Sequence, residues 1–334
     1  MRTRRSQSSS DPVSEIHHPK AIASQSLGHK PVLLHEGVDA LAISPKDTVV
    51  DATLGGAGHA REIVAKLSRG GSFIGFDLDT DAIDRAQDAL KGSAPKVTLI
   101  NANFRTVVRQ LKGHGVSKID KILFDLGWSA YQLDAGRGFS FHTDEPLLMT
   151  YGNKPGALTA AIIVNEWEET SIADVIFGWG EERYSRRIAH AIVDRRKEKP
   201  FTTARELAEV IRGAVPPAYR RGRLHPATKT FQALRIAVND ELGALKEALN
   251  GARAMLAEGG RIAVITFHSI EDRLVKHVFA DWDREGYGRR ITKKPLVPSA
   301  EEIRDNPRAR SAKLRVFENI SKRHEKTVTK NKQI

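Results

Sequence analysis

Residues 49–60, VVDATLGGAGHA, decide the fold that the sequence predicts. An apolar run ends at Asp51, a turn of small residues follows, and a helical pattern begins near His59. Small residues at such a turn allow backbone N–H groups and a helix N-terminus to approach a ligand closely. The stretch therefore predicts a strand, a ligand-binding turn and a helix, although a tight turn without a ligand has the same pattern.

The alternation of strand and helix patterns continues on the C-terminal side of this turn. Strand patterns are TVVDATL, GSFIGFDLD, VTLINAN and KIDKILFDLG, and helical patterns include HAREIVAKLSRG and TDAIDRAQDALKG. Strands that alternate with helices form parallel βαβ units, which bind ligands at the carboxyl ends of their strands. We therefore expect an α/β fold with a Rossmann-like sheet and a site at that edge.

Helical patterns replace this alternation in the middle of the chain, where they include SIADVIFGWG, ERYSRRIAHAIVDRRKEK and TTARELAEVIRGAV. One long helical pattern, TFQALRIAVNDELGALKEALNGARAMLAEGG, then leads into the strand RIAVITFHS, and SAKLRVFENI has the character of a strand at the sheet edge. We expect a discontinuous sheet domain at 29–134 and 229–320 and a mostly helical insertion at 135–228. The segments 1–28 and 321–334 are expected to be tails.

The composition favours a polyanionic partner. Lys and Arg number 53 against 41 Asp and Glu, and the formal net charge of +12 favours nucleic acid or an anionic membrane. No run approaches the roughly 18 apolar residues of a membrane span, so we expect a soluble, cytoplasmic protein. Cysteine is absent and the histidines lack paired spacing, so we expect no metal. RNA is favoured by basic clusters that include Arg183, Arg186, Arg187, Arg195, Arg196, Lys197, Arg220, Arg221 and Arg223.

Two positions after the second and third strands suit a nucleoside-containing cofactor. Asp77 lies about twenty residues after the glycine turn, where an acid accepts hydrogen bonds from ribose hydroxyls. Asp79 is the alternative, and it also suits a helix cap. Phe104 follows the third strand and is placed either beside the adenine or in the core. Enzymes that use nicotinamide dinucleotides share this pattern, which therefore does not identify the cofactor.

The end of the fourth strand, KILFDLGWS, carries more specific chemistry. A cytosine amine is a poor nucleophile, because its lone pair is delocalised, so an enzyme must accept its hydrogen bond or proton and aim it at the methyl donor. Asp125 suits that role. Residues 125–128, Asp-Leu-Gly-Trp, resemble the motif of amino-methyltransferases, in which the aromatic residue stacks on an extruded base. Trp128 either has this role or packs the insertion onto the sheet.

Two further segments are expected near the same pocket. The polar loop QLDAGRGFSF places Gln132 close to the fourth strand, as a cofactor contact. The strand RIAVITFHS brings His268 and Ser269 to the same sheet edge, where His268 is expected to orient the base or a phosphate. The alternative is a structural one, in which Ser269 caps a helix and His268 lies at the surface.

These motifs recur with others in a fixed order over nearly all of residues 29–316. The segments are HKPVLLHEGVDAL, DATLGGAGHA, FDLD, DLGWSAYQLD, RGFSF, GEERYSRRIAHAIV, HPATKTFQALRIAVNDEL, GGRIAVITFHSIEDRLVK and NPRARSAKLR. In them the chain resembles the bacterial small-subunit ribosomal RNA cytosine-N4 methyltransferases, formerly called MraW. The resemblance implies S-adenosyl-L-methionine as cofactor and methylation of the N4 amine of a cytosine in the decoding region of 16S ribosomal RNA. The cofactor contacts that it implies are Ala57, Gly58, His59, Asp77, Phe104, Asp125 and Gln132.

The chain departs from this family at three places. The family usually has two glycines before the histidine, whereas here Ala57 precedes Gly58. Residues 128–131 are Trp-Ser-Ala-Tyr where Val-Ser-Ser-Pro is typical, and DEPLLMTYG lacks the usual Asp and Arg. Three alternatives stay open. An amino-methyltransferase of another RNA or DNA base shares the motif at Asp125, and a nicotinamide-dependent oxidoreductase shares the glycine turn and the ribose acid. The departures beside Asp125 keep open a non-catalytic RNA-binding relative. The oligomeric state is not predicted.

Overall fold

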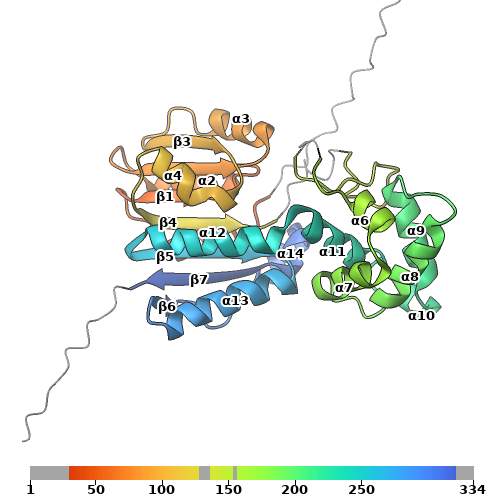
Figure 1. Cartoon of the computed structure of the whole chain (residues 1–334). Helices are drawn as coiled ribbons and strands as arrows, with labels where there is room; N and C mark the ends of the chain where they lie inside the picture. The colour runs from red at the N-terminus through yellow and green to blue at the C-terminus, as the bar shows by residue number, and fades with distance from the viewer. Residues whose placement is uncertain (1–29, 128–135, 153–155, 321–334) are drawn as a thin grey trace, which may run out of the picture.

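The structure, a computed structural model, describes residues 30–127, 136–152 and 156–320 (Figure 1). A twisted sheet with helices on both faces forms one part, and a group of helices lies beyond the end of the sheet toward which β4 points. In the described ranges, no helix is long and apolar enough to cross a membrane.

The sheet has seven strands in the order β3-β2-β1-β4-β5-β7-β6. The strands β1 to β5 are parallel, and β7 is antiparallel to both of its neighbours. The order 3-2-1-4-5 is that of a Rossmann-like sheet, so the expected fold class is confirmed. The bounds are β1 (Thr48–Asp51), β2 (Ser72–Asp77), β3 (Lys96–Asn101), β4 (Ile119–Asp125), β5 (Leu256–Thr266), β6 (Gly288–Arg290) and β7 (Lys313–Asn319).

The C-terminal strand differs in one respect from its expected position. The segment SAKLRVFENI forms β7, but β7 lies between β5 and β6 and not at the edge of the sheet. The edge is formed by β6, which has only three residues and for which no pattern was recognised in the sequence. A short edge strand leaves few unpaired backbone groups to attract another chain.

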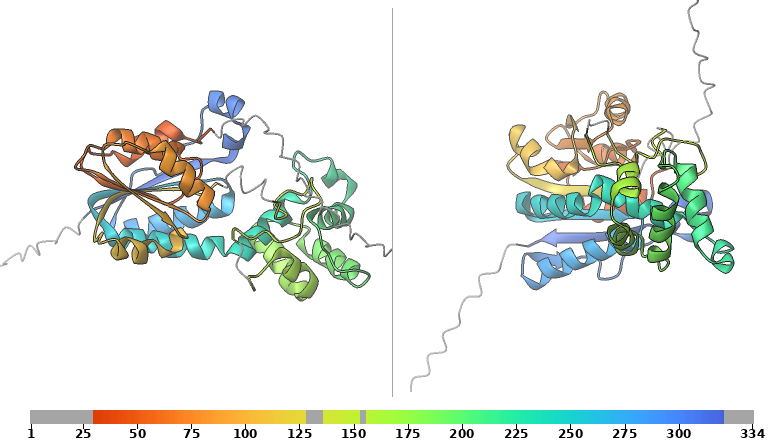
Figure 2. Two further views of the ribbon diagram at one scale, coloured as in Figure 1. Left: turned by 90° about the horizontal axis from the view of Figure 1, so that it is seen from above. Right: turned by 45° about the vertical axis from the view of Figure 1, so that its right-hand side comes forward.

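Both faces of the sheet are covered (Figure 2). Successive strand residues point to opposite faces, so Val49 packs with α1, α2 and α3 whereas Val50 packs with α4, α12 and α13. Burial on both sides explains why the strands are continuous apolar runs. The bounds are α1 (Leu34–Leu41), α2 (Gly58–Lys66), α3 (Thr80–Ala89), η1 (Phe104–Thr106), α4 (Val107–Gly113), α12 (Glu241–Met255), α13 (Ser269–Arg284), α14 (Ala300–Asp305) and η2 (Pro307–Ser311).

The remaining helices form a unit with a core of its own. This core includes Ile163, Ile176, Ile188, Leu207 and Leu234. The unit comprises α6 (Ala160–Glu166), α7 (Glu169–Gly180), α8 (Ser185–Arg196), α9 (Ala204–Ala214), α10 (Pro217–Arg220) and α11 (Thr228–Asn239). These helices interrupt the sheet part of the chain between β4 and β5, and we refer to them as the helical unit.

The long helical pattern that follows residue 229 is two helices. Asp240 separates α11 from α12 with φ 46° and ψ 47°, in the left-handed region. A short polar side chain tolerates this conformation better than most residues do. The turn directs the chain from the helical unit onto the sheet, so α11 packs its Leu234 in the helical core and α12 packs its Leu249 against the strands.

Candidate active site

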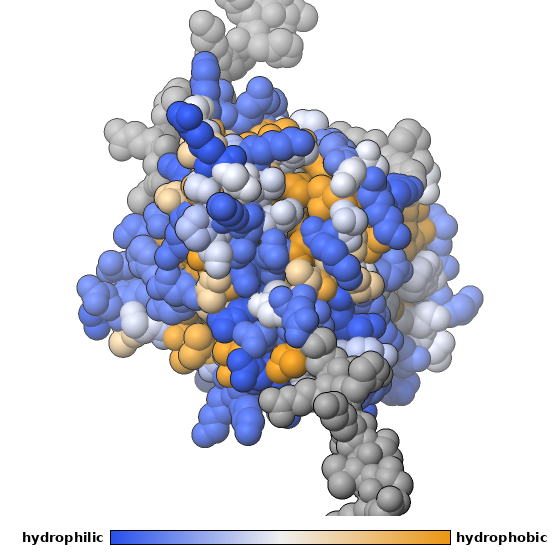
Figure 3. Space-filling model, turned by 90° about the vertical axis from the view of Figure 1, so that its left-hand side faces the viewer, coloured by the Kyte–Doolittle hydropathy of each residue, from blue (hydrophilic) through white to orange (hydrophobic). Residues whose placement is uncertain are grey.

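A cavity of about 470 Å³ is lined by residues at the carboxyl ends of the parallel strands and by residues of the helical unit. The opposite end of the sheet is mostly hydrophilic, with hydrophobic residues only in separate patches (Figure 3). Parallel sheets bind ligands where this cavity lies. Its lining includes the predicted site residues Gly58, His59, Asp77, Phe104, Asp125 and His268. Gln132 and Trp128 lie outside the described residues.

The turn after β1 brings backbone into the cavity. Ala57 adopts φ 59° and is fully buried, and its N–H donates to the Leu54 carbonyl at 2.7 Å. A Cβ atom on Gly58 would lie 2.1 Å from Cγ of Pro31, so glycine is required by the close approach of that proline. The first N–H groups of a helix have no acceptor within it. The start of α2 therefore offers hydrogen-bond donors to a ligand.

The two acids after β2 have different roles. The Asp77 carboxylate lines the cavity and accepts hydrogen bonds from the N–H groups of Gly55 and Asp79, each at 2.9 Å. Burial raises the pKa of Asp77. Asp79 instead caps α3 by accepting a hydrogen bond from Asp81 N–H. A carboxylate has about four lone-pair directions, so Asp77 can still accept hydrogen bonds from ligand hydroxyls.

Phe104 packs in the core and also lines the cavity, so both positions considered for it in the sequence are occupied. Its ring lies edge-on to the ring of Phe124, with centroids 5.9 Å apart, and therefore belongs to the core beneath the sheet end. It is also half-buried at the cavity wall. An aromatic residue in this place presents a flat apolar surface to a ligand while its edge is fixed by packing.

Asp125 lies in a buried group of titratable side chains. Its Oδ2 is 3.4 Å from Nδ1 of His59, and its Oδ1 has no hydrogen-bond partner among the described residues. Burial raises the pKa of Asp125 to about 7 and that of Asp51 to about 6, and burial lowers the pKa of His59. The backbone N–H of Asp125 donates to Thr53 Oγ1 at 2.7 Å, which fixes the strand end. The group can therefore exchange a proton near neutral pH.

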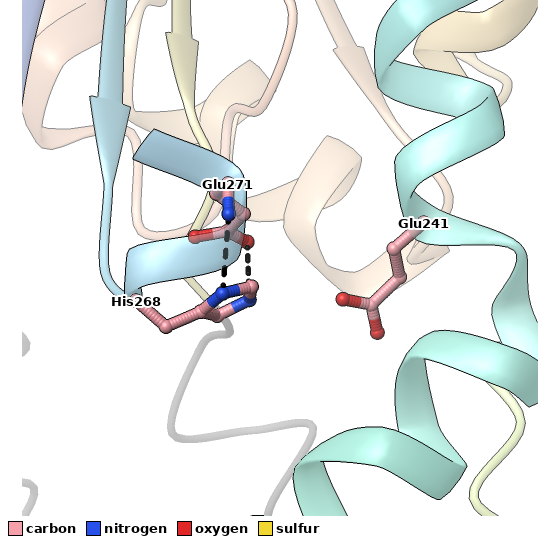
Figure 4. A group of neighbouring side chains, drawn as sticks. All are labelled: Glu241, His268 and Glu271. Carbon is pink, nitrogen blue, oxygen red and sulfur yellow. Dashed lines mark hydrogen bonds and ion pairs between the residues drawn. The ribbon is translucent and has the colours of Figure 1, made fainter. Parts of the chain in front are cut away.

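His268 caps α13 and lines the cavity (Figure 4), whereas Ser269 does not line the cavity. Nδ1 of His268 accepts from Glu271 N–H at 3.3 Å, so the ring proton is on Nε2, which lies 3.1 Å from Glu271 Oε1. The exposed Ser269 hydroxyl donates to Glu181 of the helical unit at 2.6 Å. His268 is therefore the cap that Ser269 was considered for, and its buried Nε2, although close to Glu271, has no hydrogen-bond partner among the described residues.

The sequence was compared with known protein families. The model described as the MraW methylase family matches residues 26–320. The chain belongs to this family. "Ribosomal RNA small subunit methyltransferase H" of Brevibacillus brevis is 46% identical over 311 residues, with 88% of this chain and 99% of the relative covered. The protein of the same name from Paenibacillus sp. (strain JDR-2) is 47% identical over 314 residues, with 87% and 99% covered. The resemblance found in the sequence is confirmed.

In this member of the MraW methylase family, three side chains of the cavity lining lie close enough together to be considered as metal ligands. Possible ligand atoms of Glu241, His268 and Glu271 lie within 4.8 Å of one another (Figure 4). The Glu241 carboxylate, however, already accepts two hydrogen bonds from Arg235, at 2.8 and 2.9 Å. Nδ1 of His268 is occupied as well. Glu241 and His268 therefore already have protein partners at atoms that a metal ion would need.

The same wall contains a buried ionic network that was not expected from the sequence. Arg235 is buried and pairs with Glu241, which also accepts the hydroxyl hydrogen bond of Tyr151 at 2.7 Å. Burial raises the pKa of Tyr151 well above its ordinary value. Although burial opposes it, the Glu241 carboxylate raises the pKa of Arg235. An arginine inside the apolar run FQALRIAV was the available signal, because a buried charge requires a partner.

Proposed function

We propose that the protein is an S-adenosylmethionine-dependent methyltransferase whose acceptor is the N4 amine of a cytosine in small-subunit ribosomal RNA. Membership of a methylase family and relatives named as small-subunit ribosomal RNA methyltransferases support the reaction and the RNA acceptor. The choice of an amine as acceptor rests on Asp125. Its carboxyl group is buried near the turn after β1, and its Oδ1 has no hydrogen-bond partner among the described residues. We place the reaction in the cytoplasm, where ribosomal subunits are assembled.

The residues of the cavity fit S-adenosylmethionine. The start of α2 offers N–H donors, Asp77 retains acceptor positions for two ribose hydroxyls, and Phe104 presents an apolar surface for adenine. The family also assigns a cofactor contact to Gln132, in the segment that is not described. When bound, the cofactor supplies an electrophilic methyl group. Everything else must come from the protein and the RNA.

Asp125 would orient the amine and remove its proton. A carboxylate that accepts a hydrogen bond from the amine directs the nitrogen lone pair and increases its availability. Once methylated, the nitrogen must release one proton. Asp125, with a pKa of about 7, can take that proton at neutral pH. His59 Nδ1, at 3.4 Å, provides the next position for it.

His268 would act on the ring of the base and not on the amine. Nε2 is the ring atom that would donate to the base, because Nδ1 caps α13 and Nε2 has no hydrogen-bond partner among the described residues. Cytosine carries the acceptor N3 next to its amine and the acceptor O2 farther along the same edge, whereas Asp125 offers an acceptor to that amine. The pair therefore matches the donor and acceptor order of cytosine. Ser269, which does not line the cavity, would contribute only by holding Glu181.

Nucleoside analysis of the product tests the proposed function. The purified protein is incubated with unmodified small ribosomal subunits and S-adenosylmethionine, and the digested RNA is analysed by mass spectrometry. We expect N4-methylcytidine at one site. Methylation of adenosine, or of DNA alone, would overturn the choice of acceptor. No methylated nucleoside despite measurable cofactor binding would favour the non-catalytic alternative.

A further inference from the structure

A second cavity, of about 500 Å³, lies on the helical unit near α10 and the start of α11. The cations Arg183, Arg223 and Lys229 line it together with Tyr184 and Tyr219. None of the described residues in its lining is acidic. Leu224, also in the lining, is 54% exposed, which is a large exposure for a leucine. The cavity therefore combines positive charge with exposed apolar and aromatic surface.

The two tyrosine rings are held in place by one buried carboxylate. Glu182 is fully buried, accepts the hydroxyl hydrogen bond of Tyr219, and accepts the backbone N–H of Tyr184 at 2.9 Å. Burial and Glu182 raise the pKa of Tyr219 to about 12. The ring centroids are 5.0 Å apart, and the Arg183 guanidinium lies 4.8 and 5.2 Å from them. Because the hydroxyl of Tyr219 is already bonded, its ring face is the part that remains for a ligand.

The second cavity adjoins the reaction cavity. Thr228 lines the reaction cavity and the next residue, Lys229, lines the second one. His225 of the second cavity stacks on Phe141 of the reaction cavity, with ring centroids 4.5 Å apart and an interplanar angle of 18°. The linings of the two cavities therefore touch each other at Phe141 and His225.

We propose that the second cavity binds an unpaired nucleotide that flanks the target cytosine in the same RNA strand. Its base would stack on one of the two tyrosine rings, whose planes are 75° apart, on a face that Arg183 does not cover, and its phosphates would contact Arg183 and Arg223. Aromatic rings beside arginine and lysine are the means by which proteins hold single-stranded nucleic acid without reading its sequence. Lys229 uses one donor on the Glu181 carbonyl and has others for a phosphate. This inference rests on the proposed function and adds a second contact to its substrate.

Steady-state kinetics with small ribosomal subunits tests the proposal. Arg183→Gln and Tyr184→Leu each remove a contact and leave Glu182 bonded to Tyr219. We expect each variant to raise the RNA KM by about tenfold and to leave kcat and cofactor affinity unchanged. Arg183→Gln should also reduce the salt dependence of binding by about one phosphate contact. The matched control is Arg109→Gln, at an exposed position on α4 of the sheet part.

A KM that stays unchanged in both variants, or rises equally in the control, would overturn the proposal. A rise seen with assembled subunits but not with a naked RNA fragment would also overturn it, because the occupant would then be a ribosomal protein. Cross-linking of RNA that carries 4-thiouridine beside the target cytosine is independent of turnover. Cross-links at Tyr184 or Tyr219 support the proposal even if the wild type transfers no methyl group, and cross-links confined to other segments contradict it.

Discussion

Replacement of Asp125 by asparagine should remove a pH-dependent loss of stability. Burial raises the pKa of Asp125 from 3.8 to about 7. The folded protein therefore binds one more proton than the unfolded chain between these pH values. The stability that this group contributes is fully present below about pH 4 and is lost as the pH rises to about 7. Three pH units at about 1.4 kcal/mol each correspond to a loss of about 4 kcal/mol.

Urea denaturation of Asp125→Asn and the wild type at pH 4 and pH 8 measures this loss. Asparagine has the same shape and no ionisation, so the variant should match the wild type at pH 4 and exceed its stability by up to about 4 kcal/mol at pH 8. The control is Asp84→Asn, at an exposed position on α3, which should follow the wild type at both pH values. A stability difference between Asp125→Asn and the wild type that does not change with pH would refute the raised pKa and, with it, the basis for proton uptake by Asp125.

Four further substitutions test the turn and the buried network. Gly58→Ala places a Cβ atom against Pro31 and should destabilise the protein by about 1–3 kcal/mol, as measured by thermal unfolding. It should also weaken cofactor binding, as measured by calorimetry. An unchanged melting temperature would contradict the close approach of Pro31 to Gly58. Ala57→Gly relieves about 1–2 kcal/mol of left-handed backbone strain, but it also removes a buried methyl group and adds chain flexibility, each worth up to about 1 kcal/mol. The free energy of unfolding should therefore change by less than about 1 kcal/mol. A loss above about 2 kcal/mol would show that the methyl group is essential. Arg235→Met leaves Glu241 buried without its charge partner and should lower the free energy of unfolding in urea by about 3–5 kcal/mol. Adding Glu241→Met to this variant should restore most of that loss. If the costs of the two substitutions simply add, the two residues are not coupled.

The strand ends of the sheet could be predicted because their signals are local. Apolar runs that end in Asp51, Asp77 and Asp125 identify parallel strands, and the carboxyl ends of such strands meet at one edge. In the structure Asp77 and Asp125 line one cavity, and Asp51 is buried near both of them, as that topology requires. The choice between Asp77 and Asp79 needed the structure, since both follow the same strand and only the fold decides which one faces the cavity.

The features that the sequence did not predict depend on contacts between residues far apart in the chain. Tyr151 and Glu241 are 90 positions apart, and no periodic pattern relates them. The N-terminus of α13 is a similar case, because Ser269 is the usual kind of capping residue. Glu181, 88 positions away, accepts its hydroxyl hydrogen bond, and His268 caps the helix instead. The break at Asp240 depends likewise on where α11 and α12 each bury their apolar faces.

Single-turnover methyl transfer by Asp125→Asn, measured beside its affinity for S-adenosylmethionine, tests the central claim most directly. The amide keeps the shape of the carboxyl but cannot take up the proton of the amine. We predict a rate of transfer to small ribosomal subunits that falls by at least about a hundredfold, with cofactor affinity within about threefold of the wild type. A transfer rate equal to that of the wild type would contradict the assignment of Asp125 as the group that accepts the amine proton.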